Sequence, residues 1–342
     1  DLILEARDYD INLEISIKNA NLYEGKVEDI KLYGNIANDN KALLSPLSFK
    51  LPGNSEFRVS GVFEESEMNS KFIGSVDGKG NSLNELFKWL QVDSNNIKME
   101  NLKKYNFYSD LEVSPANINL KNFYVNLDDK KTEFFGNLTV NDKEKSRSVD
   151  TTIKVSEFDF DKYISIPVDN IYFNEGILFD KLLWLNQIYS DYSININFEN
   201  LKYQNQEFKN QNINFNFGRG YFKFPKAHFA SAENIFDFEF NIDISDKNQI
   251  GNITLNAEKI KLKLRDNQNE ENTNHSKSLF DKFYKLPSLQ GFTGNIDLTA
   301  KEINLDEKLI TNFDYKNSLK NGIFGQTKLL MKIYDGTFEY KG

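Results

Sequence analysis

Apolar and polar residues alternate at every second position along most of this sequence, and this pattern constrains its fold more than any other feature. Successive side chains of a β-strand point to opposite faces, so the alternation predicts half-buried antiparallel strands with one apolar and one polar face. Turn-forming stretches such as 51–54 and 218–220 separate the alternating runs. The apolar members of the clearest runs, here called the apolar set, are Ile11, Leu13, Ile15, Phe57, Val59, Ile118, Leu120, Ile194, Ile196, Phe198, Ile213, Phe215, Phe217, Phe236, Phe238, Phe240, Ile242, Ile260, Leu262, Leu264, Ile296 and Leu298.

Three segments carry helical spacing instead. Residues 82–92 begin with a capping box from Ser82 to Glu85 and continue with apolar residues three and four positions apart. Residues 176–188 and 276–285 have a similar spacing. The sequence therefore predicts a mainly β fold of antiparallel strands with a few short α-helices.

A short internal repeat suggests how the chain is organised. The tetrapeptide Leu-Phe-Asp-Lys occurs at 178–181 and again at 279–282, each time before alternating residues, which indicates a repeat of about 100 residues. The predicted parts are, in chain order, an amphipathic β region with one short helix at 1–165, a helix-plus-strands unit at 166–265, a polar loop at 266–277 and a second, truncated helix-plus-strands unit at 278–342.

The composition excludes several classes of function. The 342 residues include 42 Lys and Arg and 51 Asp and Glu, with a formal net charge of -9. Because nucleic-acid binders need a basic surface to neutralise phosphates, we expect no nucleic-acid partner. The chain has no Cys, and of its two histidines His228 has no recognisable Ser or acid partner while His275 lies in the polar loop. We therefore expect no metal, no cofactor and no enzymatic activity.

Two further motifs have structural interpretations. Asp159 and Asp161 are paired acids with no His or Cys close in sequence, so we expect them to be solvated or to cap a helix. The glycines in residues 218–224 predict a tight turn that enters an aromatic strand. Neither motif predicts a catalytic or metal site.

The alternation alone leaves two arrangements open. In one, the apolar faces close on each other as the dry core of a sandwich or barrel. In the other, the sheet stays open and curved, and its apolar face holds acyl chains. No window approaches 18 consecutive apolar residues, so the sequence predicts no membrane-spanning helix.

A characteristic order of segments runs through most of the chain. The segments are 51–54, 57–63, 71–76, 82–93, 134–140, 158–164 and the two helix-plus-strands units that start at Leu178 and Leu279. Their order resembles the AsmA family of AsmA- and TamB-like bacterial envelope proteins. The resemblance runs from about residue 50 to the end and departs from the family in its many Phe, Asn and Lys residues and in lacking the N-terminal transmembrane helix.

This resemblance implies a non-enzymatic protein of the periplasm of a Gram-negative bacterium. It implies a long, curved antiparallel β-sheet forming a hydrophobic groove, with a few short α-helices. The groove would shield phospholipid or other acyl-lipid chains during transport between the inner and outer membranes, with a role in envelope homeostasis. Because the chain begins with Asp1, we expect a piece of a longer protein, anchored to the inner membrane by a segment outside it. Other envelope proteins are further expected partners, and the alternative function is a closed-core structural or assembly-assisting β protein that binds them through strand edges.

Overall fold

The computed structural model describes residues 10–22, 25–37, 41–65, 70–92, 96–127, 132–143, 146–165, 185–245, 249–262, 292–305, 308–321 and 323–342. The chain divides into two compact units, which are described separately below. Unit 1 comprises Asp1–Ser165 and Ser193–Gln204, and unit 2 comprises Ile166–Tyr192 and Asn205–Gly342. The four-part division expected from the sequence stays a prediction.

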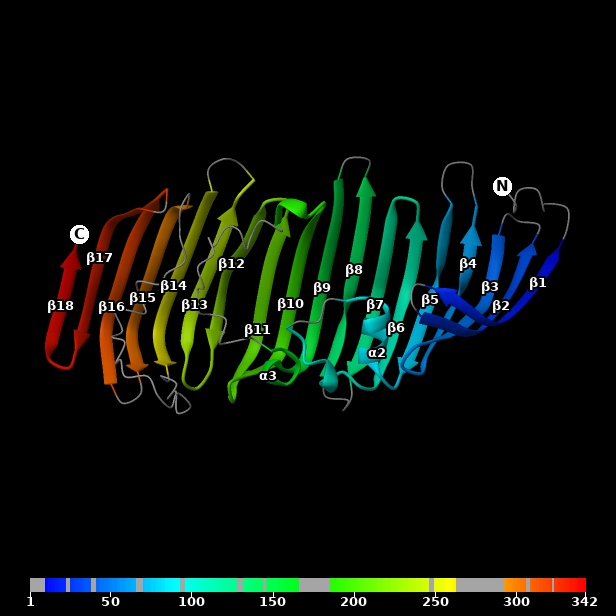
Figure 1. The fold of residues 1–342 in the computed structure, drawn as a ribbon, viewed down its shortest axis with the longest axis horizontal. Coiled ribbons are helices and arrows are strands. Elements are labelled where there is room, and N and C mark those ends of the chain that lie inside the picture. Colours follow the sequence, from blue (N-terminus) through cyan, green and yellow to red (C-terminus); the bar gives the residue numbers. More distant parts are fainter. Residues whose placement is uncertain are drawn as a thin grey trace, which may run out of the picture. The chain divides into compact units, whose positions relative to one another are not determined.

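Unit 1 is built from consecutive antiparallel strands. Each strand from β1 to β9 pairs with the next one along the chain, as the alternating pattern predicts for strands joined by short turns. Most of β10 (Ser190–Tyr203) also belongs to this unit. The strands, labelled in Figure 1, are β1 (Ile11–Leu22), β2 (Gly25–Ala37), β3 (Lys41–Leu51), β4 (Ser55–Glu64), β5 (Lys71–Gly80), β6 (Tyr105–Ser114), β7 (Asn117–Leu127), β8 (Thr132–Lys143) and β9 (Ser146–Asp159).

Unit 2 continues the same construction with one exception. Its neighbouring strands pair antiparallel except β14 and β15, which run parallel. A parallel pair needs a connection of about a dozen residues or more, and 29 residues separate Leu262 from Phe292. The strands are β11 (Gln206–Gly218), β12 (Tyr221–Ala230), β13 (Ile235–Asp243), β14 (Gln249–Leu262), β15 (Phe292–Leu305), β16 (Lys308–Lys320), β17 (Ile323–Ile333) and β18 (Gly336–Lys341).

The parallel strands β14 and β15 share half of their residues, and they pair in register. Residue n of β14 lies beside residue n + 43 of β15, so the identical residues are neighbours. This similarity is separate from the tetrapeptide, whose two copies are 101 residues apart. The matched pairs are Gly251/Gly294, Asn252/Asn295, Ile253/Ile296, Leu255/Leu298, Ala257/Ala300, Ile260/Ile303 and Leu262/Leu305.

The described part of the chain contains two short α-helices, α2 (Leu83–Trp89) and α3 (Phe160–Tyr163), and the 3₁₀ turn η1 (Met99–Asn101). Helix α2 confirms the helix predicted at 82–92, although it ends three residues early because Gln91 has φ +55° and cannot continue a right-handed helix. Ser82 caps it, since its Oγ accepts a hydrogen bond from Glu85 N at 3.2 Å.

The other two predicted helices fall largely outside the described residues. Of the segment 176–188 the structure describes only the last four residues, and residues 185–187 form one 3₁₀ turn. The segment 276–285, the polar loop 266–277 and both tetrapeptides also lie outside the described ranges. Their predictions therefore stay predictions.

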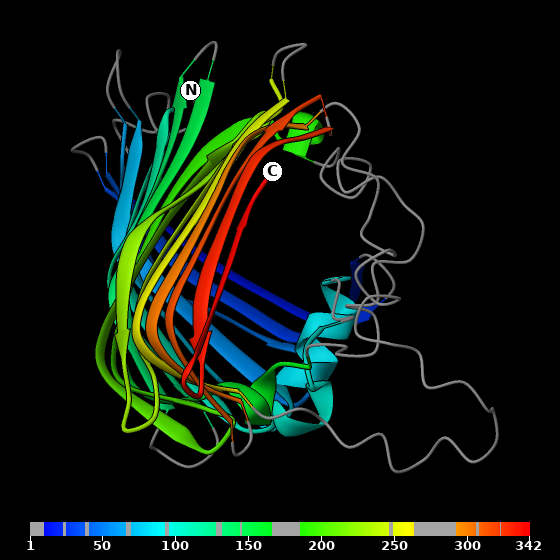
Figure 2. The ribbon, with the colours of Figure 1, turned by 90° about the vertical axis from the view of Figure 1, so that its left-hand side faces the viewer.

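The predicted fold class is confirmed. Both units are mainly β, their strands bend along their length (Figure 2), and the helices are few and short. Register shifts that accompany the bending occur at several positions, and at one of them Asn122 adopts φ +51°, a conformation that Asn tolerates better than most residues. Within the described residues, no helix is long and apolar enough to cross a membrane.

Candidate functional site

The register of unit 1 gathers apolar side chains on one face of the sheet. Directly paired residues point to the same face, so a row can be followed from strand to strand. One row runs through Ile15, Leu32, Leu47, Val59 and Val76 on β1 to β5. Equivalent rows lie on either side of it, and together they form what we call the apolar face of unit 1.

The opposite face of unit 1 is polar. Its side chains come from the alternate residues of the same strands, such as Lys50, Glu56 and Lys79, which are neighbours in the register. Ion pairs link several of them across strands, as between Lys121 Nζ and Glu112 Oε2 at 2.7 Å. The sheet is therefore amphipathic, and the solvated face carries the charges.

Among the residues that the structure describes, those around α2 cover one end of the apolar face of unit 1. Helix α2, near the ends of β6 and β7 in Figure 1, places Leu86 on this face, where it is buried with Tyr105, Leu127 and Tyr163. Elsewhere the face is accessible: four side chains of β1 are 39 to 43% exposed, although they point to the apolar side. These four residues are Ile11, Leu13, Ile15 and Ile17.

Unit 2 has an apolar face of the same kind, richer in aromatic rings. Phe217 and Phe222 are stacked with ring centroids 6.3 Å apart, and Phe222 contacts Phe240 at 5.9 Å. From Phe240 the row continues through Ile253 to Ile296 on the parallel pair. The neighbouring polar residues, such as those of the Asn252–Asn295 pair, lie on the opposite face.

The structure places the described members of the apolar set on these two faces. Phe198 contacts Phe158 with centroids 5.9 Å apart, and Ile194 and Ile196 share its face by the two-residue period. Ile11, Leu13, Ile15 and Ile118 are exposed, Ile242 is buried, and the others whose side chains are described are half-buried. The side chain of Leu262 and the whole of Leu264 lie outside the described part.

From the sequence, the helices predicted at 82–92 and 276–285 are candidates to cap or plug the groove; α2 covers one end of the apolar face of unit 1, and 276–285 lies outside the described residues. Leu86 was recognised as the apolar side of a helix, but nothing in the spacing says which strands that helix covers. Leu185 was missed in the same way, and it is fully buried in unit 2 against Ile242, Ile244 and Leu319. The apolar spacing marks both segments as helical turns with one apolar side, but no local signal says which face each turn covers.

The prediction that His228 lacks an acidic partner is wrong. His228 and Asp237 are paired across β12 and β13, with Nδ1 2.8 Å from Oδ1. Lys226 and His228, by hydrogen bonds and charge, hold the pKa of the Asp237 carboxyl below its usual range. The pair lies on the polar face, and among the described residues no serine is hydrogen-bonded to His228. This arrangement supplies a surface ion pair rather than an acid–base triad.

Asp159 caps a helix, one of the roles expected from the sequence, whereas Asp161 lies within that helix and binds a turn residue. Asp159 Oδ1 accepts a hydrogen bond from Lys162 N at 2.9 Å at the start of α3. Asp161 Oδ2 accepts one from the backbone N of Gln204. In the part of the chain that the structure describes, no cluster of three or more His, Asp or Glu residues could hold a metal ion.

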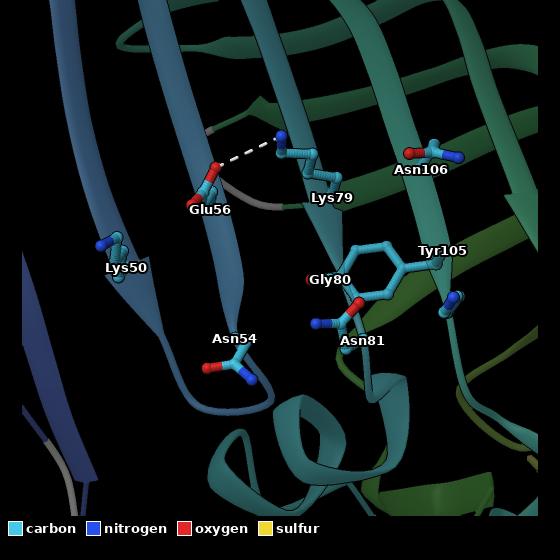
Figure 3. A pocket seen from close by; sticks show the side chains of 9 residues that line it. Lys50, Asn54, Glu56, Lys79, Gly80, Asn81, Tyr105 and Asn106 are labelled. Atoms are coloured by element: carbon cyan, nitrogen blue, oxygen red, sulfur yellow. Dashed lines mark ion pairs between the residues drawn. The ribbon is translucent and has the colours of Figure 1, made fainter.

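A hollow of about 450 Å³ lies on the polar face of unit 1 (Figure 3). It forms where β3, β4, β5 and β6 meet their turns, and one ion pair, Lys79 to Glu56 at 3.4 Å, crosses it. Its lining is polar and open, and two of its lysines, Lys50 and Lys79, form ion pairs with carboxylates. The lining residues are Lys50, Asn54, Glu56, Lys79, Gly80, Asn81, Lys104, Tyr105 and Asn106.

The comparisons with known proteins identify no relative. No family model matches the chain, and no curated protein or solved structure does so either.

Proposed function

We propose that the chain binds the acyl chains of phospholipids on its apolar faces. In this proposal the faces act as the walls of a hydrophobic groove that shields acyl chains from water while lipids pass between the inner and outer membranes of a Gram-negative envelope. The protein is non-enzymatic, works in the periplasm and is anchored to the inner membrane by a segment outside this chain. The cellular setting rests on the resemblance to the AsmA family.

The observation that carries the binding proposal is the exposure of the apolar face in unit 1. Soluble proteins rarely leave contiguous apolar patches of more than a few hundred Å² open to water unless the patch binds something. Here Ile11, Leu13, Ile15 and Ile17 are about two-fifths exposed in a row, and the register continues their face over the neighbouring strands.

An acyl chain suits this surface energetically. Each methylene removed from water contributes about 0.8 kcal/mol, so a chain of many methylenes gains much from covering an aliphatic and aromatic wall. A wall without fixed polar groups favours no single position along it, so a bound chain can move along the face. Tight binding and mobility are both needed for transport.

The proposal is tested by moving a negative charge from one face of β1 to the other. In one double variant Leu13→Glu and Ile15→Glu place carboxylates on the apolar face, and in the matched control Asn12→Glu and Ser16→Glu place them on the polar face. All four positions are exposed, so both variants are expected to fold. Native mass spectrometry with lipid extraction then measures bound lipid on purified protein from a Gram-negative host.

We expect the wild type and the polar-face control to retain phospholipid and the apolar-face variant to lose most of it. Equal lipid in both folded variants would contradict the assignment of this face. A folded wild type free of lipid would contradict the proposal as a whole and would favour the alternative of an assembly-assisting protein that binds other envelope proteins.

A further inference from the structure

The apolar face of unit 1 has two unlike ends. We call the end that carries the β3–β4 turn, α2 and α3 the capped end, and the end that carries the β6–β7 turn and the β8–β9 turn the open end. Along β7 the exposed fraction rises from 7% at Leu127, at the capped end, to 38% at Ile118, at the open end. Burial on this face is therefore graded along the strands.

Backbone hydrogen bonds hold α2, which we call the cap of unit 1, in place. Gly53 O accepts hydrogen bonds from the backbone N atoms of Asn81 and Ser82, which tie the start of α2 to the β3–β4 turn. Leu83 N donates to Lys103 O at 2.8 Å, so the helix is also fixed to the chain that enters β6. The helix is therefore fixed to unit 1 by backbone hydrogen bonds on both sides.

Unit 2 repeats this arrangement. Leu185 is fully buried on its apolar face, and its carbonyl accepts a hydrogen bond from Gly220 N in the β11–β12 turn at 3.0 Å. Both turn glycines adopt a left-handed conformation, with φ +79° at Gly53 and +77° at Gly220. In each unit a helical turn bonded to a hairpin glycine therefore closes one end of the apolar face.

Strand β9 shows what the open end offers. Its residues on the apolar face run from Arg147 through Val149 to Val155, which is only 1% exposed and lies toward the capped end. Arg147 is exposed and pairs in register with Asp142 of β8, so a guanidinium and a carboxylate terminate the apolar face together. Along β8 and β9 the apolar face therefore carries a charged pair at the open end and a buried apolar side chain toward the capped end, whereas β6 and β7 reach the open end with Val113 and Ile118.

The dimensions fit one acyl chain. The half-buried stretch from Val149 to Ile153 covers four residue steps, which is about 14 Å at 3.4 Å per residue. One leaflet of a bilayer core is about 15 Å thick, half of the roughly 30 Å hydrocarbon layer. From Arg147 to Val155 the face of β9 covers eight residue steps, about 27 Å, so an acyl chain that starts at the charged pair covers the half-buried stretch and points toward the cap.

We propose that unit 1 binds a zwitterionic phospholipid in one orientation, with the acyl end toward α2 and the headgroup at Arg147 and Asp142. A guanidinium matches the geometry of a phosphate, and the carboxylate opposite it matches an ammonium group. This inference rests on the proposed lipid binding and adds the headgroup class and the direction of the bound molecule.

Native mass spectrometry tests the headgroup with three lipids of equal acyl length: phosphatidylethanolamine, phosphatidylglycerol and diacylglycerol. We expect both phospholipids to bind more tightly than diacylglycerol. Arg147→Gln should lower the affinity for both phospholipids by about fivefold, which corresponds to the loss of one exposed charge pair. Asp142→Asn should lower the affinity for phosphatidylethanolamine and leave the affinity for the other two lipids unchanged. Arg58→Gln is the matched control, because Arg58 is exposed on the polar face.

The direction is tested with phosphatidylethanolamine that carries a diazirine on the last acyl carbon. Cross-links should map near Phe107 and Phe134, beside the cap, and not near Val113 or Val140 at the open end. Equal labelling at both ends, or phospholipid binding unaffected by Arg147→Gln, would overturn this inference while leaving lipid binding intact. If inorganic phosphate binds at Arg147 but does not displace the diazirine lipid, Arg147 is a plain anion site. That result would also overturn this inference. Failure of all three lipids to bind would instead contradict the proposed function.

Discussion

The indole of Trp89 donates a hydrogen bond from Nε1 to the carbonyl oxygen of Leu22 at 3.0 Å. This bond joins the last residue of α2 to the last residue of β1, 67 positions earlier in the sequence. The indole also lies against Gly25, where a Cβ would overlap the ring. One aromatic side chain thus ties the cap of unit 1 to the β1–β2 hairpin.

Replacing Trp89 should loosen this connection. Trp89→Phe removes one hydrogen bond but keeps most of the ring, so we expect a loss of about 1 kcal/mol in the stability of the cap. Hydrogen exchange of the Leu90 amide, which donates to Leu86 O at 2.9 Å, measures this loss of stability. Exchange as slow as in the wild type would show that the bond does not hold the helix.

The glycine beneath the indole offers an independent test by a double-mutant cycle. Gly25→Ala should destabilise the cap in the wild type because its new methyl overlaps the indole, and it should cost much less in a Trp89→Ala background. Protease susceptibility of the 82–92 segment measures both effects. Equal costs in the two backgrounds would mean that Gly25 is needed for another reason.

Leu86 should account for most of the attachment of α2. It is 6% exposed within the unit 1 cluster, so Leu86→Ala should destabilise by about 2 to 5 kcal/mol, through lost burial and a residual cavity. Leu90→Ala is the control, since Leu90 is 49% exposed and should change stability by less than about 0.5 kcal/mol. Denaturant unfolding followed by Trp fluorescence compares the two, and similar shifts in both would refute the packing described for α2.

Gly53 should tolerate no side chain. Its φ of +79° costs an L-residue about 1 to 3 kcal/mol, and a Cβ there would overlap the carbonyl oxygen of Ser82. Gly336→Ala is the control, because a Cβ added at Gly336 would have Ile333 O as its nearest atom, at an ordinary contact distance of 3.5 Å. Thermal unfolding should show a clear loss for Gly53→Ala and almost none for Gly336→Ala, and the reverse order would contradict the turn geometry.

Tyr221 should ionise later than an ordinary tyrosine. Burial, together with a 3.0 Å hydrogen bond from its hydroxyl to Asp191, raises the pKa of Tyr221 from 10.0 to about 12. Because the folded state favours the neutral phenol, this group's contribution to stability is complete below pH 10 and is lost as the pH rises from 10 toward 12.

Carbon-13 NMR of labelled tyrosines measures this titration, and the Tyr221→Phe spectrum assigns the signal. Asp191→Asn should lower the pKa while leaving it above the ordinary value, because burial, the larger cause, remains. An unchanged pKa in Asp191→Asn would exclude the carboxylate as a contributor.

The strands were predictable because their information is local. A two-residue period at 11–17 or 236–244 fixes which side chains share a face, whatever the strand later pairs with. The capping box at Ser82 fixed the start of α2 for the same reason. The end of that helix was less predictable, since Gln91 leaves the helical region of backbone space without a glycine or proline to signal it.

His228 and Asp237 show where local information ends. They are nine positions apart and meet because of a hairpin with a register shift, so no spacing rule identifies them as a pair. The in-register match of β14 and β15 is similar: the two sequences are visible, but their adjacency is not. Contacts of this kind depend on strand pairing, which the period of a sequence leaves open.

By itself the sequence determined that this protein is mainly β, that each strand has one apolar face, and that Ser82 begins a helix. These properties follow from side-chain period and capping, which act over a few residues. The tertiary structure alone decided which end of each apolar face is closed. That depends on which end of the strands Leu86 and Leu185 pack against. It also decided that Arg147 and Asp142 terminate the open end of unit 1, since only the register of β8 and β9 brings their side chains to the same face.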